Sequence, residues 1–127
     1  MFHALARMCA DCLVGTQPAK RSNKAWVEVY RGLAHGACLD ACKRASKVNF
    51  PPEIKSFTDA FQQLLRERER ADYDPTVRFS REDALKTLGL AEEAVASLKT
   101  VQMLDRRAFS AWVLITSPGA QKARKRV

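Results

Sequence analysis

The sequence predicts an all-α protein, an up-down antiparallel bundle of four to five helices. Turn residues divide the chain into five stretches, and within most of these the apolar residues recur every three or four positions. Residues that cap helices stand just before several of the stretches. Helices joined by short connections pack as antiparallel neighbours, so the pattern favours a bundle.

The first two predicted helices lie in the N-terminal third of the chain. Residues 2–14 form a short helix that Gly15 ends, and a polar linker containing Pro18 follows. A second helix runs from Ser22 or Asn23 to about Lys47. Its apolar residues share one face at spacings of three and four: Trp26, Tyr30, Leu33, Ala37 and Ala41. This segment has the strongest helical pattern in the chain.

Three further helices are predicted after Asn49. Pro51 and Pro52 suit the first turn of a third helix that ends near Tyr73, with an apolar face made by Ile54, Phe57, Phe61, Leu64 and Leu65. Ser80 and Asp83 resemble a capping box for a fourth helix, whose buried face is Ala84, Leu88, Ala91, Val95 and Leu98. The last stretch, residues 105–115, contains residues that strands also favour, and we interpret it as a helix.

Size and charge indicate one domain with a basic tail. The 127 residues suit one domain, with 46% hydrophobic and 28% charged residues as in ordinary globular proteins. We assign residues 1–117 to the helical bundle and residues 118–127 to a disordered tail. Within the net charge of +8, four basic residues of the tail have no nearby acid: Lys122, Arg124, Lys125 and Arg126. The tail is thus either a contact for nucleic acid or a frayed, solvated end.

The absence of a long apolar stretch and of a secretion-signal pattern predicts a cytosolic protein. No stretch approaches the roughly 20 apolar residues that cross a bilayer, and we expect no membrane association. In a reducing compartment the thiols of Cys9, Cys12, Cys38 and Cys42 usually act as small buried hydrophobes. Zinc held between two helices is the alternative, but we predict no metal and no cofactor.

Polar residues and cysteines share the opposite face of the second predicted helix: Lys24, Arg31, His35, Cys38 and Cys42. This face can be covered by the bundle itself, by a second subunit or by a ligand. Arg31 and His35 are four residues apart, so both can reach one anion across a helical turn. The histidine can then remove a proton from a ribose hydroxyl while the arginine holds the phosphate. Packing at the surface is the simpler alternative.

Polar residues also occur on the apolar face of the third predicted helix. Arg68 and Asp72 lie one turn apart, and we interpret them as a structural ion pair that closes the bundle together with the Tyr73 hydroxyl. Contact of Arg68 with a phosphate is the alternative.

Three segments resemble the HEPN superfamily of small prokaryotic helical proteins. They are KAWVEVYRGLAH at residues 24–35, FPP at residues 50–52 and LRERERADYDP at residues 65–75. The resemblance covers roughly residues 22–113. His35 matches the histidine of the family, and Lys24 stands where relatives often have an arginine. Arg68, Asp72 and Tyr73 match a stretch at the end of the third helix.

The resemblance implies a bundle of four or five helices that forms a homodimer. It also implies metal-independent RNA cleavage as in toxin-type relatives, with Arg31 and His35 as catalytic residues and Lys24 and Arg68 as contacts for phosphate or RNA. Many members act with a minimal nucleotidyltransferase antitoxin, which makes such a protein a candidate partner beside RNA or a nucleotide. A non-catalytic, dimerising interaction module of the same fold is the alternative.

Overall fold

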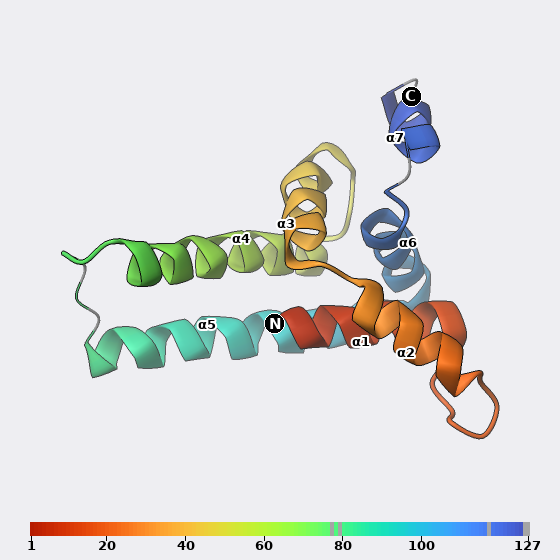
Figure 1. Cartoon of the computed structure of the whole chain (residues 1–127), viewed down its shortest axis with the longest axis horizontal. Coiled ribbons are helices and arrows are strands. Elements are labelled where there is room, and N and C mark those ends of the chain that lie inside the picture. The colour runs from red at the N-terminus through yellow and green to blue at the C-terminus, as the bar shows by residue number, and fades with distance from the viewer. Residues whose placement is uncertain (77, 79, 117, 126–127) are drawn as a thin grey trace. The chain divides into compact units, whose positions relative to one another are not determined.

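The computed structural model describes residues 1–76, 78, 80–116 and 118–125, and over these residues the chain is all-α, as predicted (Figure 1). It contains the 3-10 turn η1 (Ala45–Lys47) and seven α-helices: α1 (Phe2–Val14), α2 (Asn23–Gly32), α3 (His35–Arg44), α4 (Pro52–Tyr73), α5 (Arg81–Thr100), α6 (Met103–Leu114) and α7 (Pro118–Lys125). In this part of the chain no helix has the length and apolar character that crossing a bilayer requires. Two more helices are present than the predicted maximum of five.

One of the additional helices arises because the predicted second helix is interrupted. Leu33 ends α2 in an extended conformation, with φ −77° and ψ 123°, and α3 begins at His35. Gly32 and Gly36 flank the break, and each glycine disfavours helix by about 1 kcal/mol relative to alanine. Leu33 itself is buried, so the break places an apolar side chain in the core. The prediction of one continuous helix from Asn23 to Lys47 was wrong.

The other additional helix is α7, in the segment predicted to be a disordered tail. Pro118 occupies its first position, where the missing N–H costs nothing, and after Gly119 come alanine, glutamine, lysine and arginine, all of which favour helix. The Arg124 guanidinium lies 4.1 Å from the centroid of the Trp112 ring, and its Nη2 donates to the Trp112 carbonyl over 3.3 Å. These contacts hold α7 to α6. Arg126, the last basic residue of the tail, lies outside the described residues.

Contacts divide the chain into two compact units. The terminal unit joins Phe2–Ala41 to Gln102–Val127, and the α4–α5 unit comprises Cys42–Val101 together with Met1. The predicted single domain over residues 1–117 stays a prediction, since these units are groupings by contact.

In the terminal unit, α1 packs against both α2 and α6. The buried residues of α1 are Leu5, Ala6, Met8, Cys9 and Ala10, and those of α6 are Phe109, Ser110 and Val113. Full burial of a phenylalanine such as Phe109 contributes roughly 1.5–3 kcal/mol. The α1–α6 contact therefore joins the two ends of the chain through apolar packing.

In the α4–α5 unit the two long helices lie side by side and are joined by residues 74–80 (Figure 1). The predicted capping box is confirmed: the Asp83 backbone N–H donates to the Ser80 hydroxyl over 3.1 Å, and the Ser80 N–H donates to the Asp83 carboxylate over 3.0 Å. Ile54, Phe57 and Phe61 are buried, as their spacing predicted.

The predicted burial along α5 is confirmed only near the C-terminal end of the helix. Leu98 is buried, but 55% of Leu88 is exposed and Ala84 is exposed as well. Two helices bury only the seam between them, and the apolar side chains beyond that seam stay open to water. Predicted burial of Leu88 and Ala84 was therefore wrong.

Candidate nucleic-acid interface

Nearly all of the net positive charge belongs to the terminal unit. Its residues include eleven basic and four acidic side chains, a net charge of +7, whereas the α4–α5 unit has eleven basic and ten acidic side chains, a net charge of +1. Four of the eight excess charges were expected in the tail, and the structure assigns tail and N-terminal helices to the same unit. The terminal unit as a whole is thus suited to an anionic partner.

Many cations of the terminal unit are exposed to solvent. The exposed ones are Arg7, Lys20, Lys24, Arg31, Arg107, Lys122 and Lys125. Lys24 is in the first turn of α2 and Arg31 in its last turn, and neither forms an ion pair with a described residue. Both are therefore available to an external anion, as the sequence analysis expected for Lys24.

Arg31 and His35 lie on different helices. Arg31 lies in the last turn of α2 and His35 begins α3, so the single helical turn on which their convergence was predicted does not exist. Both side chains are exposed, and the ring centroid of His35 lies 3.9 Å from that of Phe2. The two residues therefore share no helical face, and their convergence on one anion stays a prediction.

A row of stacked side chains joins α1 to α2. The Trp26 and Tyr30 rings are nearly parallel, with centroids 5.2 Å apart, and the Tyr30 ring stacks on His3 at 6.0 Å. The Tyr30 hydroxyl and His3 Nδ1 share a hydrogen bond of 2.8 Å. At the other end of the row the Arg21 guanidinium lies 4.5 Å from the centroid of the Trp26 ring. The sequence analysis placed Trp26 and Tyr30 in the apolar face and missed this stack.

Arg21 is fixed by polar contacts as well as by Trp26. Its Nη1 donates to the Gly15 carbonyl over 3.0 Å and lies 3.5 Å from the Asp11 carboxylate, and its Nε donates to the Asn23 side chain over 3.1 Å. The Trp26 indole N–H donates to the same Asp11 oxygen over 2.9 Å. This arrangement holds a guanidinium rigidly at the loop between α1 and α2.

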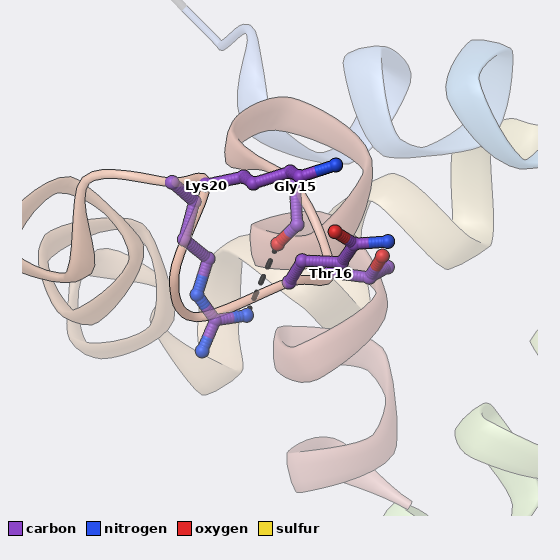
Figure 2. Close-up of a pocket in the computed structure, with 5 residues that line it drawn as sticks. Gly15, Thr16 and Lys20 are labelled. Carbon is purple, nitrogen blue, oxygen red and sulfur yellow. Dashed lines mark hydrogen bonds between the residues drawn. The ribbon is translucent and has the colours of Figure 1, made fainter.

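The loop itself forms a hollow of about 240 Å³ beside Arg21 (Figure 2). Gly15, Thr16, Gln17, Lys20 and Arg21 line it. Gly15 has φ +124°, a conformation that side chains disfavour, which explains glycine at the point where α1 ends and the loop turns.

The cysteines are buried within the protein. Cys9, Cys38 and Cys42 are almost fully covered, and Cys12 is half-buried. Burial raises the pKa of Cys9 and of Cys38 to about 12, so both are neutral thiols at physiological pH. Among the described residues no group of His, Cys, Asp and Glu side chains is arranged to hold a metal ion. Cys38 and Cys42 thus serve the core, and they do not extend an exposed face around His35.

The predicted ion pair on α4 forms, but it lies at the solvent-exposed surface and not on a buried face. Arg68 Nε lies 3.8 Å from the Asp72 carboxylate, with 68% and 56% of these side chains exposed, and Tyr73 is 83% exposed. A pair this exposed contributes about 0–1 kcal/mol. The prediction that these residues close the bundle was wrong, and Arg68 stays open to solvent.

Comparison with protein-family models, with curated proteins and with solved structures found no match. The resemblance to HEPN proteins expected from the sequence therefore stays a prediction.

Proposed function

We propose that this protein binds RNA through the terminal unit. The observation that carries the proposal is the unequal charge of the two units, +7 against +1. RNA is a polyanion, and proteins that neutralise its phosphates with Lys and Arg gain affinity through release of counterions. The likeness to HEPN proteins, many of which act on RNA, supports the same conclusion.

The exposed cations of α2 provide the direct test. A double charge reversal, Lys24→Glu with Arg31→Glu, is compared with the matched reversal Lys47→Glu with Lys55→Glu in the α4–α5 unit. All four side chains are exposed, so neither variant disturbs the core. Fluorescence anisotropy with a labelled single-stranded RNA of about twelve nucleotides measures the affinity over a range of salt concentrations.

The expected result is a wild-type affinity that falls linearly on a logarithmic plot against salt, with a slope of about −0.7 per phosphate contacted. The reversal in α2 reduces the affinity by at least tenfold, and the reversal in the α4–α5 unit changes it much less. Equal losses in the two variants contradict the assignment to the terminal unit. Absence of RNA binding by the wild type at low salt refutes the proposal.

Metal-independent cleavage by Arg31 and His35 is the catalytic form of this proposal. The break between α2 and α3 removes the helical register that supported it, so we expect binding without cleavage. The same RNA is incubated with the protein in the presence of a chelator and separated by electrophoresis. RNA fragments that the wild type produces and the His35→Ala variant does not would instead establish nuclease activity.

A non-catalytic, dimerising module is the second candidate function, and the exposed apolar side chains of α5 favour it. Leu85 is 59% exposed and Leu88 is 55% exposed, and both are on the part of α5 that the α4–α5 seam does not cover. Light scattering after size exclusion measures the mass of the wild type and of Leu85→Ser with Leu88→Ser. A dimer that the variant loses supports the module, and a monomeric wild type rejects it.

The remaining parts of the proposal concern architecture, location and partners. We propose that the helices form an up-down bundle, which is supported by the packing of the consecutive pairs α1–α2 and α4–α5. The cysteine chemistry supports action in the cytosol. A nucleotidyltransferase partner rests on the HEPN likeness alone, and co-purification of a protein encoded beside this chain tests it.

A further inference from the structure

We propose that the hollow between α1 and α2 is a seat for a phosphate group of RNA, formed by Arg21, Lys20 and Thr16. This inference deepens the proposed function and rests on it. The seat lies in the terminal unit, in the loop that follows Gly15 (Figure 2). Its ligand is a phosphate, either within the RNA backbone or at a 5′ end.

Arg21 supplies the rigid half of the seat. Its Nε and Nη1 atoms are occupied by Asn23, Gly15 and Asp11, while Nη2 forms no hydrogen bond with a described residue. The Arg21 side chain is 13% exposed, and the two N–H groups of Nη2 are the donors that it keeps for an anion. Because the guanidinium is already positioned, it loses little entropy on binding.

Lys20 supplies the exposed half of the seat. Its side chain is exposed, forms no ion pair with a described residue, and lines the hollow next to Thr16, whose hydroxyl can donate a further hydrogen bond (Figure 2). The residues that line the hollow include two cations and no carboxylate. Asp11 contacts Arg21 but does not line the hollow. The volume of about 240 Å³ admits a phosphate and part of its sugar, but not a folded segment.

The geometry separates this seat from the rest of the basic surface. The exposed cations elsewhere in the terminal unit are single side chains that can attract any anion at long range. At the loop, a lysine and an arginine adjoin a hydroxyl in one hollow, and the arginine is held by four neighbouring residues, including Trp26. The arginine of the seat is therefore positioned before a phosphate binds.

The test uses the full chain and two RNA probes, a decauridylate with a 5′-phosphate and one with a 5′-hydroxyl. Lys20→Ala removes one cation. Arg21→Lys keeps the positive charge but removes the planar guanidinium group. Lys55→Ala, at an exposed lysine of the α4–α5 unit, is the matched control. We expect Lys20→Ala to reduce affinity about 3- to 10-fold and to lower the salt slope by about 0.7, whereas the control leaves both unchanged.

The two probes distinguish the source of the phosphate. A seat for the terminal phosphate gives the 5′-phosphorylated RNA an advantage that Lys20→Ala abolishes, and a seat for the backbone gives equal losses with both probes. Because Arg21→Lys can disturb the loop, Lys20→Ala decides the result. RNA binding that Lys20→Ala does not weaken overturns the seat and leaves the proposed function intact.

A second measurement tests phosphate binding at the seat directly, and it applies even when the wild type binds no RNA. Titration with inorganic phosphate is followed by the amide NMR signals of residues 15–21. Saturable shifts in this loop that are absent from Lys20→Ala support the seat. Shifts that are absent, or spread equally over the exposed lysines of both units, overturn it.

Discussion

Replacement of Trp26 by phenylalanine removes two of the interactions that position Arg21. The indole N–H donates to the Asp11 carboxylate over 2.9 Å, and the Arg21 guanidinium lies 4.5 Å from the ring centroid. Loss of the hydrogen bond costs about 1 kcal/mol, and a weaker cation–π contact costs about 0.5–1 kcal/mol. We therefore expect Trp26→Phe to lower the free energy of unfolding by about 1–2 kcal/mol.

Urea unfolding followed by circular dichroism at 222 nm measures this change. Trp112→Phe is the matched variant, because the Trp112 indole N–H donates to the Ala41 carbonyl over 2.9 Å and Arg124 lies 4.1 Å from its ring. The chain has two tryptophans, so each variant keeps one fluorescent reporter. Both variants should lose similar stability, but only Trp26→Phe should also weaken RNA binding, since only Trp26 positions Arg21.

A stability loss below about 0.3 kcal/mol for Trp26→Phe would refute the reasoning, because the contacts would then contribute nothing net. RNA affinity equal to that of the wild type, at a protein concentration where the variant is folded, would separately show that a rigid Arg21 is not needed.

Further predictions concern acid stability, thiol reactivity and the core. The backbone N–H of Ser80 lowers the pKa of Asp83 below its ordinary value of 3.8, so this stabilisation is complete above that value and is lost as the pH falls through the lowered pKa. Acid titration of Asp83→Asn by circular dichroism should lack that part of the pH dependence. A colorimetric disulfide reagent at pH 8 should react quickly with Cys12 only, and two fast thiols would contradict the raised pKa values of buried cysteines. Phe109→Ala should lower the free energy of unfolding by about 3–5 kcal/mol in urea titrations, while Leu104→Ala, at a side chain 78% exposed, should stay within about 0.5 kcal/mol of the wild type.

Local chemistry made most helix ends predictable. Gly15 ends α1, Pro52 begins α4, and Ser80 with Asp83 caps α5, because each depends on residues within one turn. The apolar spacing also identified the buried part of α4. The start of α6 was predicted within two residues, and its helical form was confirmed.

Features that depend on distant residues were missed. Periodicity continues through Leu33, so it does not reveal that burial of this side chain and two nearby glycines favour a break. The position of Arg21 depends on Asp11 and Trp26, which belong to different helices. Consequently the sequence placed Lys24 and Arg31 on the polar face of the second predicted helix, but it assigned Arg31 a partnership with His35 that requires an unbroken helix.

The contact between α1 and α6 has a consequence for synthesis on the ribosome. The apolar side of α1 is covered by α6, whose residues are translated about ninety positions later. Until then Leu5 and Cys9 of the nascent chain lack their final neighbours, whereas α4 and α5 can pair as soon as both have emerged. The α4–α5 hairpin should therefore form first during translation, and the emerging N-terminal segment should be the part that chaperones shield.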